Sequence, residues 1–183
     1  MPLASIICSS SFVLLLPAPL LVRSGRWSTS GGIKYSLLRL LKIVTAFTVG
    51  HSITLLVGGL GWVHLPERPV EMAIGITIIV SAFHAIRPLF PGWEPVLAGG
   101  FGLIHGLAFS SAIAPFGFSA WHMMMTILAF NLGIELMQMA AVLAVVPPLI
   151  FMANRQWYSV IRIGSAATAV VAATGWIIFG PPA

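Results

Sequence analysis

Charged side chains are scarce in this chain of 183 residues, of which they make up only 7%. A soluble domain carries about 25% charged residues, because ionised groups must cover the surface that faces water. Hydrophobic residues make up 58% of the chain instead. The composition therefore excludes a water-soluble protein and predicts an integral membrane protein.

Aspartate is absent, and cysteine occurs once, as Cys8. A single cysteine excludes a disulfide within the chain and any metal site that needs several thiolates. The sequence also lacks a Gly-rich phosphate loop, zinc-finger spacing and a patch of mixed basic and aromatic residues. Its net charge of +5 is therefore no sign of nucleic acid as a partner, and the basic residues are better explained as topology signals.

Six long apolar stretches run through the chain, and a membrane-spanning helix needs about 20 such residues. They cover residues 3–22, 36–60, 70–87, 95–115, 121–151 and 159–179. A backbone in hydrocarbon must satisfy its own hydrogen bonds, and strand-like alternation is absent. We therefore expect an all-α bundle of about six spans, forming a single transmembrane domain over residues 1–183.

Two of the six stretches carry features that a simple span lacks. The first stretch could also be a cleaved signal peptide, but signal peptides begin with basic residues, whereas Arg23 and Arg26 follow this run. That order favours a span. Pro147 and Pro148 lie inside the fifth stretch and should kink or end its helix, because proline removes a helical hydrogen bond.

Basic residues gather on one side of the predicted spans. That side holds Arg23, Arg26, Lys34, Arg39, Lys42, Arg87, Arg155 and Arg162. The opposite side holds only Arg68. Loops on the cytoplasmic side of a membrane carry an excess of basic residues. We therefore expect a multi-pass protein of the inner (plasma) membrane with both termini outside.

Carboxylates inside a membrane are costly, so those within predicted spans are candidates for function. Glu67 and Glu94 are expected in loops. Glu135 lies in the middle of the fifth span, on one helix face with Asn131 and Gln138. This polar stripe should point into the bundle, as a functional site or as a hydrogen-bonded link between helices.

Histidines complete this set of intramembrane polar residues. His105 shares a helix face with Gly102 and Ala98, small residues that let another helix approach, so it should face the bundle interior. At about 1.5 Å per residue, five polar side chains fall at successive depths. They are Glu71, outermost and at the start of its helix, and then His51, His105, Asn131 and Glu135. Imidazole and carboxylate together suit Ni²⁺, Co²⁺ and Zn²⁺.

Four segments resemble the HupE/UreJ family of membrane proteins. They read LLKIVTAFTVGHSITL at 40–55, VEMAIGITIIVSAFHAIRP at 70–88, FGLIHGLAF at 101–109 and FNLGIELMQ at 130–138. The family is linked to hydrogenase and urease clusters and is regarded as containing nickel permeases. The resemblance covers roughly residues 36–179 and implies a metal site of His51, Glu71, His105, Asn131 and Glu135. It does not extend to His84.

The first helix departs from the family pattern. The family has a His and a Gly-x-Asp-His motif there, whereas this chain has no Asp and no His before His51. Residues 1–22 are therefore expected to be a shortened or degenerate first helix that has lost metal ligands.

These observations favour a permease that passes a divalent ion inward, most simply nickel, with cobalt or zinc as alternatives. Glu71 would attract the ion, while His51, His105 and Glu135 coordinate it and Asn131 orients it or adds an oxygen. No cofactor is expected to be tightly bound. No hydrolase motif appears, so we expect no enzyme activity.

Two other functions remain open. One is a non-transporting accessory protein for metalloenzyme assembly, in which the polar residues would hold helices together. The other is an electron-transfer protein with His51 and His105 as haem ligands. The expected partners are the lipid bilayer, the metal ion, and either a second copy of the chain or a metalloenzyme-assembly protein.

Overall fold

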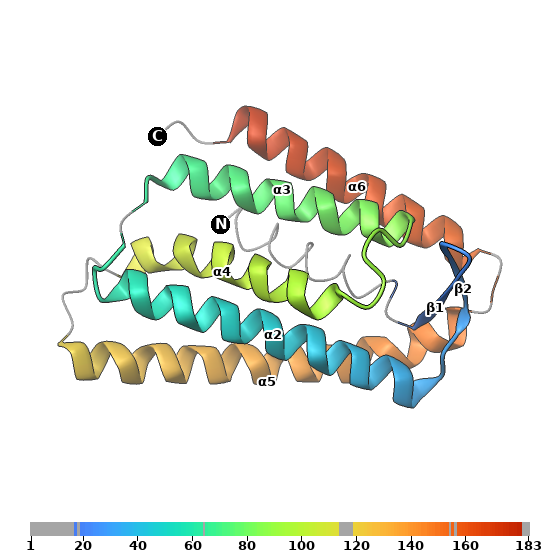
Figure 1. The fold of residues 1–183 in the computed structure, drawn as a ribbon, viewed down its shortest axis with the longest axis horizontal. Helices are drawn as coiled ribbons and strands as arrows, with labels where there is room; N and C mark the ends of the chain where they lie inside the picture. Colours follow the sequence, from blue (N-terminus) through green and yellow to red (C-terminus); the bar gives the residue numbers. More distant parts are fainter. Residues whose placement is uncertain are drawn as a thin grey trace. The chain divides into compact units, whose positions relative to one another are not determined.

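The structure is a computed structural model that describes residues 17, 19–63, 65–113, 119–153, 155 and 157–180. Figure 1 shows that this described part is mostly helical. Its elements are β1 (Leu20–Arg23), β2 (Arg26–Ser30), α2 (Ile33–Gly59), α3 (Glu67–Ile86), α4 (Glu94–Ile113), α5 (Ala120–Ala153) and α6 (Tyr158–Phe179). The predicted all-α class holds for the bulk of the chain, and the two strands are an exception to it.

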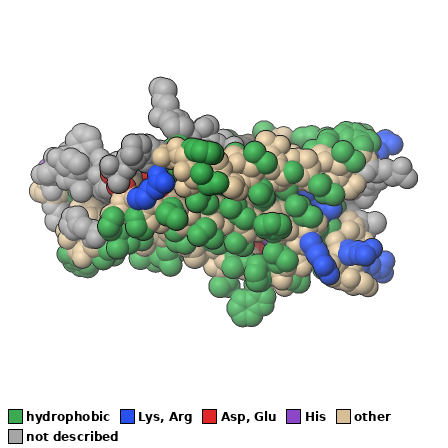
Figure 2. All heavy atoms as spheres, turned by 90° about the horizontal axis from the view of Figure 1, so that it is seen from above, with side chains coloured by type: hydrophobic (Ala, Val, Ile, Leu, Met, Phe, Trp, Pro, Cys, Tyr) green, Lys and Arg blue, Asp and Glu red, His purple; other side chains and the backbone are tan. Residues whose placement is uncertain are grey.

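The five helices correspond to the five apolar stretches that begin at residue 36, and their ends lie within three residues of the predicted ends. Among the described residues, α2, α3 and α6 are long and apolar enough to cross a membrane. Figure 2 shows hydrophobic side chains over much of one face of the molecule. Exposed apolar side chains include Phe179, Met137 and Val171, which are 73–85% accessible. Such a surface is suited to lipid.

A hairpin of the two short strands follows Pro19. The sequence analysis predicted the end of a spanning helix over residues 3–22, and that prediction is wrong for residues 20–22. Proline lacks the N–H that a helix needs, and Pro17 and Pro19 stand directly before β1. Residues 3–16 of the predicted span lie outside the described residues.

The hairpin turn consists of Ser24 and Gly25, whose φ angles are 50° and 71°. Positive φ at both central residues is typical of the two-residue turns that match the twist of paired strands. Arg23 pairs with Arg26 across this turn. The hairpin tip is therefore basic.

Several helix ends differ from the predicted ones. Helix α5 does not end at Pro147 and Pro148 but continues to Ala153. Glu67 and Glu94 are the first residues of α3 and α4, although loops were predicted there. A carboxylate at this position interacts favourably with the helix dipole. Glu94 is also buried, so it is no solvated loop residue.

The chain divides into two compact units. Unit 1 comprises residues 1–40, 75–92 and 141–180, and unit 2 comprises residues 41–74, 93–140 and 181–183.

In unit 1 the hairpin is anchored to the helices. A buried cluster joins it to α5 and α6, and its members are Leu20, Leu149, Ala153 and Tyr158. Trp27 of β2 donates a hydrogen bond from Nε1 to the carbonyl oxygen of His84, at 3.1 Å. The two rings also meet edge-on, with centroids 5.4 Å apart. These contacts hold the hairpin against the end of α3.

Helices α3 and α6 lie side by side in unit 1 (Figure 1). Their approach is close at Gly75, where an added Cβ would lie 2.6 Å from Cγ1 of Ile177. Glycine at this position therefore leaves room for the isoleucine side chain.

Candidate metal centre

Helices α2 and α4 of unit 2 approach each other through glycines, and this approach positions two histidines. A Cβ added at Gly102 would lie 2.9 Å from the backbone nitrogen of His51 and 3.0 Å from the carbonyl carbon of Phe47. A Cβ at Gly106 would collide with the backbone of His51 in the same way. Only glycine allows the backbones to come this close. The prediction that small residues beside His105 let another helix pack there is confirmed.

His51 and His105 are both buried, with 4% and 3% of their surfaces exposed. The ring of Phe47 contacts both of them. It stacks on His51 with centroids 6.1 Å apart and meets His105 at 5.3 Å with an interplanar angle of 62°. The two histidines therefore lie near each other within unit 2, one on each side of the ring of Phe47 or along its edge.

The orientation of His105 is set by its own helix. Its Nδ1 lies 2.8 Å from the carbonyl oxygen of Phe101, one turn earlier. A carbonyl oxygen only accepts, so Nδ1 carries a proton and donates it. In the neutral ring Nε2 then holds the free lone pair, the form in which imidazole binds metals. This Nε2 is buried and has no hydrogen-bond partner among the described residues.

Asn131 supplies a second buried polar group on α5. Its side chain is 6% exposed, and neither Oδ1 nor Nδ2 has a hydrogen-bond partner in the described part of the chain. Ile127, four residues earlier, packs with Met123 against Leu55 of α2. Because residues four apart share a helix face, Asn131 continues the face of α5 that packs on α2.

Of the two carboxylates in the predicted site, the structure describes the side chain of Glu71 but not that of Glu135. Glu71 is half-buried and lies one turn inside α3, which begins at Glu67 and not at residue 70. Glu135 follows Asn131 by four residues in α5, but its side chain lies outside the described residues. Among the side chains that are described, no three from His, Cys, Asp or Glu lie close enough to hold a metal ion together. The structure thus brings together His51 and His105.

His84 has a structural role. Its Nδ1 accepts hydrogen bonds from the backbone N–H groups of Leu89 and Phe90, at 3.2 and 3.3 Å. The ring thereby fixes the turn that follows α3. Its exclusion from the predicted metal site agrees with this geometry.

Phe47 is the residue of this centre that the sequence analysis missed. It lies four residues before His51, a spacing that places both on one face of α2. That spacing could have identified it, because an aromatic ring beside a buried histidine displaces water from it.

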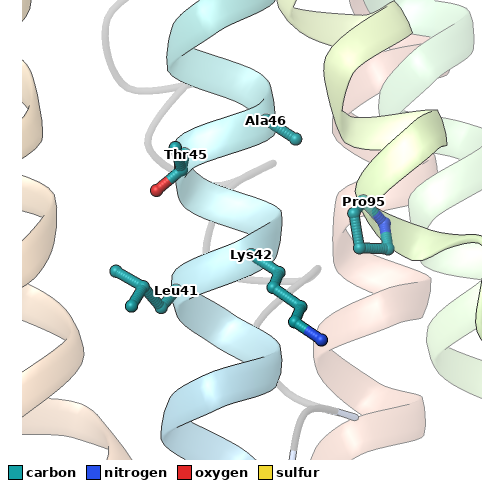
Figure 3. A pocket seen from close by; sticks show the side chains of 5 residues that line it. All are labelled: Leu41, Lys42, Thr45, Ala46 and Pro95. Atoms are coloured by element: carbon teal, nitrogen blue, oxygen red, sulfur yellow. The ribbon is translucent and has the colours of Figure 1, made fainter.

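A separate groove lies near the start of α4. Figure 3 shows its lining, with Lys42 extending from α2 toward the start of α4 at Pro95. The other lining residues are Leu41, Thr45 and Ala46. An ammonium group repels a metal cation, so this groove is no candidate for the metal centre.

A family model described as HupE / UreJ protein matches residues 11–179. The match spans nearly the whole chain and covers every described helix and strand. It confirms the resemblance found in the four sequence segments. No curated protein and no solved structure matches the chain.

Proposed function

This chain belongs to the HupE/UreJ family, and we propose on that basis that it passes a divalent transition-metal ion, with nickel as the expected ion, across the inner membrane. The family is associated with nickel or cobalt transport or with urease accessory function. The observation that supports metal transport is the environment of the Nε2 atom of His105. It is buried, oriented by its own helix and without a hydrogen-bond partner among the described residues.

A buried imidazole nitrogen with a free lone pair can coordinate a metal cation. Burying a polar atom without a hydrogen bond costs about 1–3 kcal/mol, which a bound metal ion would offset. Imidazole nitrogen is a good ligand for Ni²⁺, Co²⁺ and Zn²⁺. His51 would supply the second nitrogen, since Phe47 contacts both rings.

Oxygen donors would complete the set of ligands. Asn131 has a buried side-chain oxygen without a hydrogen-bond partner among the described residues. Glu135, one turn further along α5, would contribute a carboxylate, and Glu71 would attract the ion at the outer end. A mixed set of few nitrogen and oxygen ligands, without thiolates, binds weakly enough to release the ion, as transport requires.

The proposal is tested by nickel uptake. Cells that express the wild type, His105→Ala or His122→Ala are compared with cells that carry an empty vector. His122 is the matched control, because it is exposed and its loss also removes one imidazole. We expect His105→Ala to reduce accumulation to the vector level and His122→Ala to retain it, at equal protein abundance.

Two results would count against this function. Equal accumulation by wild type and His105→Ala, both above the vector, would remove His105 from the metal path. No accumulation by the wild type, together with urease or hydrogenase activity that depends on the protein, would favour the accessory role. Competition by cobalt and zinc identifies the preferred ion.

A further inference from the structure

The Nε2 atom of His105 is closed off from its surroundings in this structure. It is buried and has no hydrogen-bond partner among the described residues, and only 3% of the residue's surface is exposed. An ion such as Zn²⁺ binds an imidazole nitrogen at about 2.0–2.1 Å. Part of the protein must therefore move before an ion can reach this atom.

The seam between α2 and α4 is poorly suited to this movement. An added Cβ would meet the opposing backbone at three successive places along it, namely at Gly50 against Gly99, at Gly102 against Phe47 and at Gly106 against His51. Backbone in close contact moves only with its whole helix, so opening the seam would break all of these contacts together. A side-chain movement disturbs much less of the structure.

Phe47 is the side chain placed to make this movement. Its ring stacks on the imidazole of His51 and meets that of His105 with centroids 5.3 Å apart. Both histidines are buried, whereas Phe47 is half-buried and so lies at the boundary of the centre. A change of its χ1 rotamer would carry the ring away from both imidazoles without moving the backbone.

We propose that Phe47 is the gate of the metal centre. Rotation of its ring away from His51 and His105 admits an ion to Nε2 of His105, and the return of the ring excludes water from the bound ion. Apolar constrictions gate ion paths by excluding water, and an apolar shell controls solvent access to a metal site. This inference rests on the proposed metal path and adds the control of access to it.

Reaction with diethyl pyrocarbonate measures the gate in the absence of metal. An unprotonated imidazole nitrogen attacks a carbonyl carbon of the reagent, a nitrogen–carbon bond forms, and the leaving ethyl carbonate decomposes to carbon dioxide and ethanol. Peptide mass spectrometry then gives a separate rate for each histidine. His122 is exposed and reports the activity of the reagent, whereas His84 is buried in unit 1 and reports general unfolding.

The purified full chain is compared as wild type, Phe47→Ala and Phe130→Ala. Phe130 is the matched control, because it is an exposed phenylalanine of the same unit. We expect Phe47→Ala to raise the reaction rate of His105 at least about tenfold, since opening no longer requires the loss of two ring contacts. Phe130→Ala should leave this rate unchanged, and His122 should react equally in all three proteins.

Two results would overturn the gate. One is an equal rate for His105 in the wild type and Phe47→Ala, and the other is a wild-type rate for His105 as high as that of His122. If Phe47→Ala also exposes His84, Phe47→Leu replaces it, because leucine fills the space without a ring. Faster reaction of His105 with His84 still protected would then support the gate, and an unchanged rate would overturn it.

Addition of nickel separates the gate from the proposed function. Nickel bound at Nε2 should slow the reaction of His105 in both the wild type and Phe47→Ala. Absence of this protection would contradict the metal site, whereas the difference between the two proteins without metal would still identify Phe47 as the side chain that controls access to His105.

Discussion

Replacing Gly102 with alanine adds one methyl group where α4 lies against the backbone of α2. The added Cβ would lie 2.9 Å from the nitrogen of His51 and 3.0 Å from the carbonyl carbon of Phe47. Heavy atoms in favourable contact are about 3.5–4.0 Å apart. Because backbone atoms cannot rotate away as the end of a side chain can, the two helices must separate by about 0.5–1 Å, which forfeits roughly a quarter to a half of the attraction between facing atoms.

The expected loss is that of an overpacked interior, about 1–3 kcal/mol of unfolding free energy. Gly100 provides the control, because it lies on the same helix and nothing lies within 4 Å of its added Cβ. Gly100→Ala should stabilise the protein by about 0.5–1 kcal/mol, since alanine is the better helix former. The same chemical change therefore has opposite signs two residues apart, with a difference of about 1.5–4 kcal/mol.

The assay is unfolding of the purified variants in mixed detergent micelles, with nickel uptake measured in parallel. Separation of the helices also moves Phe47 and His51 away from His105, so uptake should fall in Gly102→Ala and persist in Gly100→Ala. If Gly102→Ala were as stable as Gly100→Ala, the close contact between α2 and α4 would be wrong, and with it the geometry of the metal centre.

Two further predictions concern unit 1. Trp27→Phe keeps a ring beside His84 but removes the hydrogen bond to its carbonyl oxygen, so the hairpin should lose about 0.5–1.5 kcal/mol and its amides should exchange faster with deuterium; unchanged exchange would contradict this anchoring. Gly75→Ala should destabilise unit 1, because the added methyl group would clash with Ile177. Ile177→Ala removes that clash, so the double variant should be more stable than the sum of the two single effects predicts. Additive effects of the two changes on the free energy of unfolding would contradict the contact between α3 and α6.

Helices were the most predictable part of the fold, because hydrocarbon sets both their length and their composition. The apolar stretches predicted at 70–87 and 159–179 became α3 and α6 with small changes at their ends. The changes follow from polar residues that hydropathy ignores. Glu67 begins α3 because a carboxylate is favourable at a helix N-terminus, although it is charged.

The hairpin could not be found by hydropathy, because β1 is the end of a longer apolar run. Its signals were local and weaker: Pro17 and Pro19 before the strand, and the turn pair Ser24 and Gly25 after it. A strand of four residues is too short for alternation to stand out from the surrounding apolar residues. Pairing with β2 and the anchor at Trp27 stabilise it, and these are tertiary contacts that a periodicity does not contain.

The candidate site was predictable where it depended on depth and was not predictable where it depended on hydrogen bonds. Counting residues placed His51 and His105 at successive depths in the membrane, and Gly102 predicted a close contact between helices. The bond from His105 Nδ1 to the carbonyl of Phe101 decides which nitrogen is available, and it depends on side-chain rotamers that a sequence does not contain. The contact of the Phe47 ring with the rings of both His51 and His105 depends on the same side-chain packing.

Arg162 changes the interpretation of the basic residues as a whole. Counted along the sequence, it is one of eight basic residues that predict the cytoplasmic side, and its burial, with 8% of its surface exposed, is invisible there. Sorted by compact unit, the charges separate into +7 for unit 1 and −2 for unit 2, which holds four glutamates, Lys42 and Arg68. Net negative charge in the unit that carries His51 and His105 favours the approach of the cation proposed above. This separation differs from the one that predicts topology, because Lys42 counts with the cytoplasmic residues along the sequence but falls in unit 2.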